Sequence, residues 1–311
     1  MKIKRRSWFR STFQLRGSVI PAIIERSIVC AGFGLFVSIL YYYKLPVSIP
    51  VLGNAIPSVV LGLVLVFRTN TAYDRFWEGR RLWGSLVNTL RNLAWQIWVN
   101  VDETTPANDN ISVRDRKIVA LRLLIAFALA KKKHLRSEPP DSKLASFLSV
   151  AQYSLLQKTR HMPLEIARWL GEHLKQEWQQ QRLPLYQLTA MQTLINTLME
   201  CVGGCERILK TPLPLAYSIH IKQLVLLYCL VLPFQFVRDL NWWTAPFTAL
   251  VSLTLFGIEE IGIEIENPFG TDANDLQLEA ICNTIEQNIE EFIATEEVGL
   301  IAFSEDAKTL N

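Results

Sequence analysis

Three large apolar side chains recur at four-residue spacing within the segment IPSVVLGLVLVF, residues 56–67. They are Val59, Leu63 and Phe67, and residues four apart lie on one face of a helix. If several copies of the segment surround an axis, such faces form stacked apolar rings, and apolar constrictions can gate a pore by excluding water. Any apolar helix offers a similar set, so contact with lipid is the ordinary alternative.

The residues around this segment favour the pore over the lipid alternative. Ser58 and Gly62 are small enough to let neighbouring helices approach closely. Arg68 and Asn70 follow directly, and their polar groups suit the water-filled mouth of a pore. One subunit has little room to enclose a channel, so the pattern predicts several identical copies around a closed symmetry axis.

A second stretch with chemistry of its own is NPFGTDAND, residues 267–275. Asp272 and Asp275 are three residues apart and could share a hard cation such as calcium through their carboxylate oxygens. The alternative is that one of them caps the following helix, because a side-chain oxygen at that position accepts free backbone N–H groups. The residue types favour the cap.

The remaining reactive residues indicate no enzyme. The sequence has no phosphate-binding loop, no GxSxG motif and no HExxH motif. Cys201 and Cys205 lie one helical turn apart without a second pair, whereas zinc needs four ligands, so the five cysteines are expected to be reduced thiols. The net charge of +3 gives no support for nucleic-acid binding. We expect no catalytic residue and no cofactor, with calcium only as the alternative described above.

Four apolar segments are long enough to carry such a pore, because a helix needs about 20 residues to cross a bilayer. They cover residues 19–43, 51–67, 215–237 and 244–263. Half of all residues are hydrophobic although a fifth are charged, which is typical of membrane spans joined to a sizeable soluble part. Each segment alone could be a buried helix of a soluble protein, but their pairing into two hairpins favours a multi-pass integral membrane protein.

Lysines and arginines predict the orientation, since loops rich in them stay in the cytoplasm. The tail 1–18 and the middle segment 68–214 are rich in both residue types, whereas each hairpin tip holds only one. Both termini, including residues 265–311, are therefore expected in the cytoplasm. The two membrane hairpins would cover 19–67 and 215–264.

Helix-forming residues dominate the cytoplasmic segments, and no stretch alternates in the manner of a β-strand. The predicted helices cover 69–100, 112–130, 142–158, 163–180, 184–210 and 275–295, with a turn-rich linker over 101–110. The basic run KKKHLR, residues 131–136, is expected to be a solvated helix end, and attraction of anionic lipid or incoming anions is the alternative. The predicted fold class is an all-α membrane protein with four transmembrane helices and a helical cytosolic region.

Three stretches spread over nearly the whole chain resemble the bestrophins, in particular their prokaryotic and chloroplast branch. They are FRTNTAYDRFWEGRRLWG after the second apolar segment, LPLAYSIHIKQLV at the start of the third, and ENPFGTDANDLQLE after the fourth. The resemblance implies a ring-shaped homopentamer around one central pore. Each subunit would have four spans and a large helical cytosolic part.

The resemblance also implies two constrictions. The family has a neck of three apolar rings on span two, and counting back from the FRTN junction places these rings on the apolar face described above. The family's second ring of side chains lies in the cytosolic part. Here it falls near the start of the helix 184–210, at Leu185, Tyr186 or Leu188.

Vertebrate bestrophins bind calcium at a clasp that includes the acidic run after NPFG. This sequence keeps Asp272 and Asp275. It has Thr271, Ala273 and Asn274 where vertebrate chains are acidic. This departure argues against calcium gating.

Members of the family conduct small ions. Vertebrate and plant members pass anions such as chloride and bicarbonate, while some bacterial members pass monovalent cations. The net positive charge and the aromatic Phe67, whose ring edge carries partial positive charge, favour chloride or another monovalent anion. A sodium or potassium channel of the same fold and a non-conducting membrane scaffold are the alternatives. A bacterial inner membrane and a photosynthetic membrane fit equally.

Overall fold

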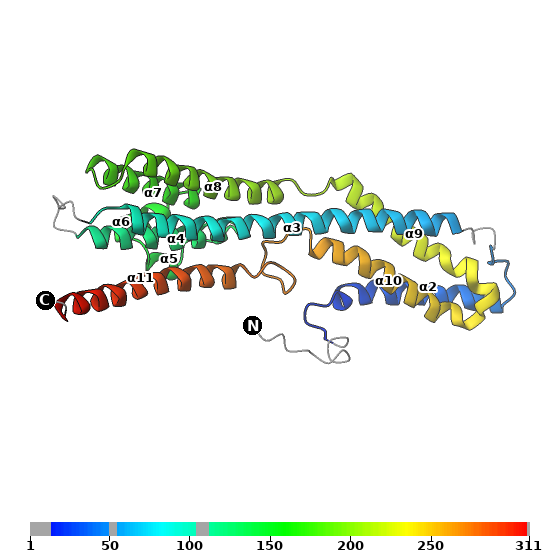
Figure 1. Cartoon of the computed structure of the whole chain (residues 1–311). Helices are drawn as coiled ribbons and strands as arrows, with labels where there is room; N and C mark the ends of the chain where they lie inside the picture. Colours follow the sequence, from blue (N-terminus) through cyan, green and yellow to red (C-terminus); the bar gives the residue numbers. More distant parts are fainter. Residues whose placement is uncertain (1–13, 50–54, 104–111, 310–311) are drawn as a thin grey trace. The chain divides into compact units, whose positions relative to one another are not determined.

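The computed structural model describes residues 14–49, 55–103 and 112–309, and no β-strand occurs among them (Figure 1). The predicted all-α fold is confirmed for this part of the chain. The helices are α2 (Ile20–Tyr42), α3 (Ala55–Asn100), α4 (Val113–Leu135), α5 (Ser142–Ala145), α6 (Val150–Leu156), α7 (Met162–Gln179), α8 (Leu185–Lys210), α9 (Leu215–Leu240), the 3-10 helix η2 (Asn241–Trp243), α10 (Thr244–Glu264) and α11 (Leu278–Thr309). Most of the predicted tail and linker, and the start of the second apolar segment, lie outside the described residues.

The helices form two compact units, each built from two stretches of the chain. The first, called the apolar unit here, comprises Met1–Trp77 and Thr211–Asp275. The second, called the α4 unit, comprises Glu78–Lys210 and Leu276–Asn311. Helix α3 contributes to both units and runs unbroken over 46 residues. At the usual rise per residue it is about 69 Å long, so the second apolar segment and the first predicted cytosolic helix are one helix.

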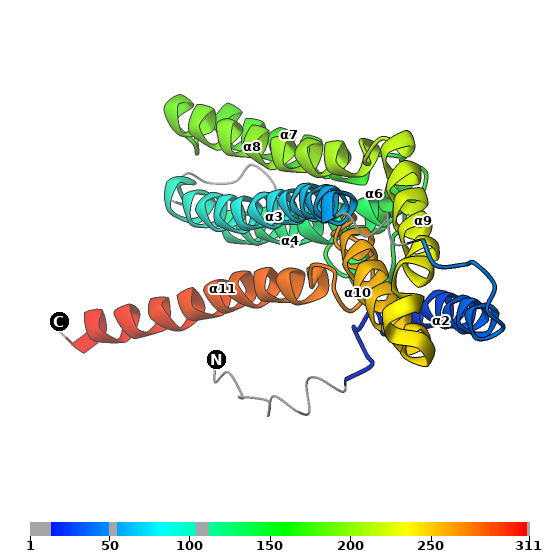
Figure 2. The same ribbon diagram turned by 90° about the vertical axis from the view of Figure 1, so that its right-hand side faces the viewer.

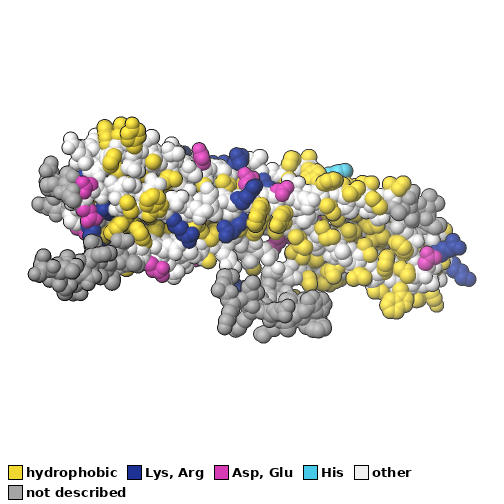
Figure 3. Space-filling view, viewed as in Figure 1, with side chains coloured by type: hydrophobic (Ala, Val, Ile, Leu, Met, Phe, Trp, Pro, Cys, Tyr) yellow, Lys and Arg dark blue, Asp and Glu magenta, His cyan; other side chains and the backbone are white. Residues whose placement is uncertain are grey.

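The apolar unit exposes long hydrophobic helices. Three stretches have the length and composition to cross a membrane, namely Ile20–Tyr42, Ile56–Asn100 and Leu215–Glu264, the last of which comprises α9, η2 and α10. Only 22% to 33% of each apolar window is buried, so most of these side chains face outward. Figure 3 shows many hydrophobic side chains gathered on one face of this part of the molecule. Such a surface is expected of helices that are solvated by lipid.

Close packing of α2 on α10 organises the apolar unit, and both helices lie beside α9 in two views (Figures 1 and 2). A Cβ atom added to Gly34 would lie 3.2 Å from the Cα atom of Ala245 and 3.1 Å from the hydroxyl of Thr248. Small residues at a crossing allow this approach, which is how membrane helices commonly associate. The core of the unit consists of Ile23, Cys30, Leu61, Leu65, Ile221, Val225, Cys229 and Phe256.

Helix α4 is buried on nearly all sides in the α4 unit. It packs against α7, α8 and α11. Every residue from Leu123 to Lys133 is buried. Its start is fixed by Ser112, whose hydroxyl accepts the backbone N–H of Asp115 at 3.0 Å. A helix that is apolar around its whole circumference becomes the centre of a bundle, with the other helices packed around it.

The basic run at the end of α4 is not the solvated helix end that the sequence suggested. Lys131 is fully buried, and its ammonium lies 4.5 Å from the centre of the Trp83 ring, as in a cation–π contact. Lys132 is buried as well, and the ammonium of Lys133 lies 2.8 Å from the carboxylate of Asp141. The prediction was wrong because the sequence shows the charges but not the aromatic and acidic partners that the fold brings to them.

Two predicted helix boundaries also differ from the structure. The expected helix 142–158 is divided into α5 and α6, because Ser149 starts a new helix. The Ser149 hydroxyl accepts the N–H of Gln152 at 3.3 Å, and the Gln152 amide oxygen accepts the N–H of Ser149 at 3.0 Å. The last helix, expected over 275–295, begins at Leu278 and continues to Thr309.

Candidate pore-lining site

The face of α3 that carries the predicted neck points away from its own subunit. Val59, Leu63 and Phe67 are 58%, 52% and 63% exposed. Leu61 and Leu65, on the opposite side of the same helix, are buried in the core of the apolar unit. The three exposed side chains span eight residues, which is about 12 Å along the helix. The structure therefore offers a continuous apolar face about 12 Å long to another surface.

Gly62 lies beside this face and is open. A Cβ atom at Gly62 would meet nothing within 4 Å, so packing inside the described subunit does not require a glycine there. By contrast, a Cβ at Gly262 would lie 3.3 Å from the Nε atom of Arg68, so that glycine makes room for a side chain of its own subunit. An exposed glycine on an apolar helix suits close approach of a neighbouring helix.

The two predicted mouth residues lie in different surroundings. Asn70 is exposed, one turn beyond Phe67. Arg68 is buried, donates a hydrogen bond to the hydroxyl of Ser218 at 3.1 Å, and lies 3.7 Å from the carboxylate of Glu266. Asn70 can thus meet the solvent that follows the apolar face, whereas Arg68 ties α3 to the start of α9 and the end of α10.

The three candidates for the second constriction differ in how much of the side chain is exposed. At the start of α8, Leu185 and Tyr186 are 57% and 91% exposed. Leu188 is only 5% exposed and packs into the α4 unit. A side chain that narrows a path has to reach it, so the geometry favours Leu185 and Tyr186.

A Schellman turn positions the start of α8. Helix α7 ends at Gln179, and Gln181 adopts a left-handed conformation with φ of 60°. The N–H of Gln181 bonds to the carbonyl of Trp178, and the N–H of Arg182 bonds to the carbonyl of Glu177, both at 2.9 Å. The chain therefore turns sharply just before Leu185.

A buried ion cluster holds the same turn from the side. The carboxylate of Glu177 lies 2.6 Å from the Nε atom of Arg182 and 2.6 Å from the Nε atom of Arg116 on α4. Burial raises the pKa of Glu177, but the two guanidinium groups lower it by more, so its pKa lies below the ordinary value. Glu177 therefore stays ionised and links α4, α7 and the turn into α8.

The exposed face of α8 is polar but carries no charge near its start. No acidic or basic residue occurs from Leu185 to Met199. Thr189 and Thr193 lie one turn apart on the exposed face, and their hydroxyls donate to backbone carbonyls four residues earlier at 3.0 Å. The signal for this face in the sequence is the four-residue spacing of Thr189, Thr193 and Thr197, which is neither apolar nor charged.

The loop before α11 does not bear out the predicted cap. Because α11 begins at Leu278, neither Asp272 nor Asp275 is the residue preceding the helix. Instead, the carboxylate of Asp275 accepts the N–H of Asp272 at 2.7 Å and closes the loop on itself. One carboxylate oxygen is thus already used by the backbone, and the side-chain amide of Asn274 donates to Glu264 at 2.8 Å. This donor set fits calcium poorly, since calcium needs six or more oxygen ligands.

One cluster in the α4 unit has residue types that can bind metal, and no spacing in the sequence indicates it. The Nε2 atoms of His134 and His161 lie 2.6 Å and 3.0 Å from one carboxylate oxygen of Glu206. The Nδ1 atom of His161 accepts the N–H of Leu164 at 3.1 Å and caps α7. A backbone N–H can only donate, so Nδ1 carries no proton and Nε2 carries it toward Glu206. A metal on that Nε2 would cost the cap, so the cluster fits a hydrogen-bond network and not a metal site.

The five cysteines and the ion pair of Glu260 are consistent with structural roles. All five cysteines are free and buried, as the sequence indicated. Glu260 lies 3.0 Å from the guanidinium of Arg26. The described residues contain no constellation of the kind that catalyses hydrolysis or group transfer, and the fold with its exposed apolar helices defines an all-α integral membrane protein.

Comparison with known proteins identifies the family. Residues 1–291 match the family described as Bacterial/Fungal Bestrophin protein. A voltage-dependent anion channel-forming protein of Nostoc sp. is 57% identical over 94% of this chain and 93% of that protein. A protein of the same kind from Synechocystis sp. is 50% identical over 93% of this chain and 92% of its own length. The chain therefore belongs to the bacterial and fungal bestrophin family.

Solved structures agree with this assignment. A variant of a bacterial bestrophin homologue from Klebsiella pneumoniae has a TM-score of 0.80 and 29% sequence identity to this chain. The match covers 90% of this chain and 99% of that chain. The resemblance seen in the three sequence stretches is confirmed.

Proposed function

We propose that this protein is a channel for small monovalent anions, chloride first and bicarbonate as a further candidate. The observation that carries the proposal is the exposed apolar face of Val59, Leu63 and Phe67 on α3. It occurs in a chain whose relatives are named voltage-dependent anion channel-forming proteins. A face of this kind forms stacked rings only when several copies surround an axis, so the channel is a ring-shaped oligomer, a pentamer by family resemblance.

The proposed topology has four spans in each subunit. These are α2, the first part of α3, α9 and α10, with η2 as the turn between the last two. Both termini and the α4 unit then lie in the cytoplasm, in agreement with the distribution of lysine and arginine. The membrane is a bacterial inner membrane or a photosynthetic one.

The proposed ion path has an apolar neck and a second narrowing in the α4 unit. Asn70 lines the mouth that follows the neck, while Leu185 and Tyr186 provide the second narrowing. Thr189 and Thr193 add hydroxyl oxygens to an uncharged wall beyond it. Calcium plays no part in gating, because the loop of Asp272 and Asp275 fits that ion poorly.

Reversal potentials in planar bilayers under asymmetric potassium chloride test the proposal. Purified protein should conduct, and the potential should shift toward the chloride equilibrium potential. A shift toward the potassium equilibrium potential would establish the cation channel of the same fold. Absence of current from well-folded protein would favour the non-conducting scaffold.

A triple variant tests whether the exposed apolar face of α3 forms the neck of the pore. Replacing Val59, Leu63 and Phe67 together by Ala widens the proposed constriction and should raise the single-channel conductance several-fold. Replacing Val60 and Val66 by Ala is the matched control, because both residues are exposed on α3 beside the predicted face. Equal conductances in the wild type and the triple variant would place the neck elsewhere.

A further inference from the structure

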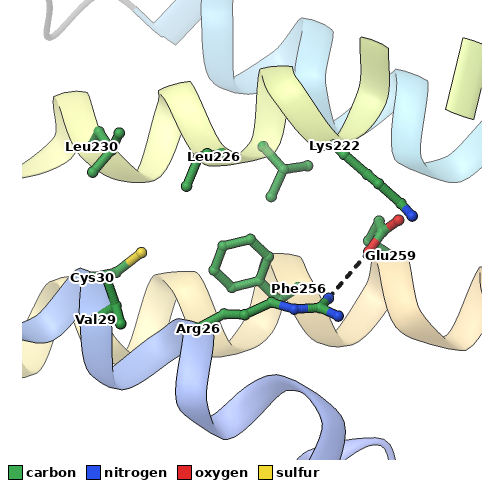
Figure 4. Close-up of a pocket in the computed structure, with 9 residues that line it drawn as sticks. Arg26, Val29, Cys30, Lys222, Leu226, Leu230, Phe256 and Glu259 are labelled. Carbon is green, nitrogen blue, oxygen red and sulfur yellow. Dashed lines mark ion pairs between the residues drawn. The ribbon is translucent and has the colours of Figure 1, made fainter. Parts of the chain in front are cut away.

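A cavity of about 360 Å³ lies in the apolar unit between α2, α9 and α10 (Figure 4). A volume of this size falls in the range of small-molecule sites. Most of the wall is apolar, and Val29 and Leu226 are themselves exposed, so the cavity opens to the outside of the described subunit. The lining residues are Arg26, Val29, Cys30, Lys222, Val225, Leu226, Leu230, Phe256 and Glu259.

The cavity has a charged end and an apolar end. Arg26, Lys222 and Glu259 gather at one end, while Cys30 and Leu230 lie toward the other (Figure 4). The charged end is formed by the start of α2, the start of α9 and the end of α10. This arrangement matches an amphiphile that has a polar headgroup and a hydrocarbon chain.

Glu259 at the charged end lacks a hydrogen-bond donor on one side. Its side chain is 2% exposed, and its Oε1 atom has no hydrogen-bond partner among the described residues. The other oxygen lies 4.0 Å from the guanidinium of Arg26, which makes its shorter contact to Glu260 at 3.0 Å. A buried carboxylate oxygen without a donor is costly, so this position calls for an O–H or N–H group from a bound molecule.

Lys222 supplies the complementary charge. Its side chain is exposed and points toward the charged end of the cavity (Figure 4). Its ammonium faces the carboxylate of Glu259 and attracts it electrostatically, without an ion pair of 4.0 Å or less among the described residues. Two cations, Arg26 and Lys222, stand against one carboxylate among the residues that line the cavity, and this excess of positive charge favours an anionic group such as a phosphate.

We propose that this cavity binds phosphatidylglycerol. The phosphate would pair with Lys222 and Arg26, and a headgroup hydroxyl would donate to Oε1 of Glu259. One acyl chain would lie along Leu226, Leu230 and the ring of Phe256. The lining residues hold two cations and one carboxylate, so a lipid of net negative charge fits them better than zwitterionic phosphatidylethanolamine. Phosphatidylcholine has neither an O–H nor an N–H group in its headgroup and leaves Glu259 without a donor.

Native mass spectrometry of the full-length protein tests this binding. Delipidated oligomer is titrated with phosphatidylglycerol, phosphatidylethanolamine or phosphatidylcholine carrying identical acyl chains. We expect phosphatidylglycerol to bind at least about tenfold more tightly than phosphatidylcholine, since tenfold corresponds to about 1.4 kcal/mol. Equal affinities for the three lipids, or tightest binding of phosphatidylethanolamine, would overturn the proposal.

Variants assign the binding to this cavity. Lys222→Gln should weaken phosphatidylglycerol binding about tenfold, while Arg238→Gln, at the other end of α9 and outside the cavity, should leave it unchanged. Glu259→Leu should remove the discrimination against phosphatidylcholine. Leu226→Trp fills the cavity and should abolish binding of every lipid. Two results would show that a second copy of the chain covers this face instead. One is an equal loss of phosphatidylglycerol affinity in Lys222→Gln and Arg238→Gln. The other is a Leu226→Trp variant that changes only the oligomeric state. The measurement needs no current, so its result is independent of the proposed anion selectivity.

Discussion

The substitution Glu177→Gln should loosen the start of α8 and change both stability and conductance. It removes the negative charge between Arg182 and Arg116 but keeps the shape of the side chain. Glu177 and Arg182 are each 1% exposed, so the guanidinium of Arg182 would lose its carboxylate partner away from water, and Arg116, 12% exposed, would lose the same carboxylate. The turn into Leu185 would lose its lateral support.

The structure sets the size of the effect. Removing one partner of a buried ion pair costs about 3–5 kcal/mol. Domains of this kind are stable by about 5–15 kcal/mol in total, so the loss is a large fraction of the stability of the α4 unit. At about 2–4 °C per kcal/mol, the melting transition of a unit of this size should fall by roughly 6–20 °C.

The control is a second glutamate on the same helix. Glu172 also pairs with an arginine, Arg168, but its side chain is 53% exposed. Exposed pairs contribute at most about 1 kcal/mol, so Glu172→Gln should leave the melting temperature within about 4 °C of the wild type.

Both variants are measured as full-length protein in detergent. Thermal unfolding followed by circular dichroism gives the melting temperature, and hydrogen exchange of the amides in α7 and α8 locates the change. Bilayer recordings then compare single-channel conductance, which should change in Glu177→Gln only. Equal melting temperatures for the two variants, or faster exchange confined to α9 and α10, would show that Glu177 does not support the turn into α8.

Three further predictions follow from the same unit. The pKa of Glu177 lies below its ordinary value, so its contribution to the free energy of unfolding is complete above about pH 4.5 and is lost as the pH falls further. Acid unfolding curves of the wild type and Glu177→Gln should therefore converge at low pH. Gln181→Gly should raise the free energy of unfolding by about 0.5–1 kcal/mol, because glycine adopts the left-handed conformation without strain; denaturant titration measures this, and a loss of stability would contradict it. Leu188→Ala should lower the free energy of unfolding by about 2–5 kcal/mol, because it truncates a buried side chain. Leu185→Ala should change the conductance and leave the free energy of unfolding within about 0.5 kcal/mol of the wild type, because Leu185 is exposed. The reverse pattern would exchange their roles.

Local patterns predicted most of the helices. The apolar period predicted that Val59, Leu63 and Phe67 share one face of α3, because side-chain direction in a helix depends on spacing. The structure leaves all three exposed, together with Ile56, Val60 and Val66. The same reasoning found α4, α7 and α8 to within a few residues. It missed the division at Ser149, since a capping box competes with helix continuation through two specific hydrogen bonds.

Features that depend on distant partners could not be predicted from spacing. Lys131 looked solvated in the sequence, but its burial depends on Trp83, which lies 48 positions earlier in the chain. The network of His134, His161 and Glu206 joins three helices and has no sequence pattern. The choice between Leu185 and Leu188 required knowledge of which side of α8 packs against the rest of the unit.

The burial of the basic run changes how the protein's charge should be understood. Among the described residues, six basic side chains are buried, but only two acidic ones are. The buried lysines and arginines contact partners inside the subunit and so are not on the surface that a passing ion meets, and the formal charge of the whole chain is only +3. Long-range attraction gives little reason for chloride to be preferred over potassium. In the proposed channel, discrimination would therefore arise over the last few ångströms, where an ion would exchange its water for contacts with Phe67, Asn70 and the uncharged wall of α8.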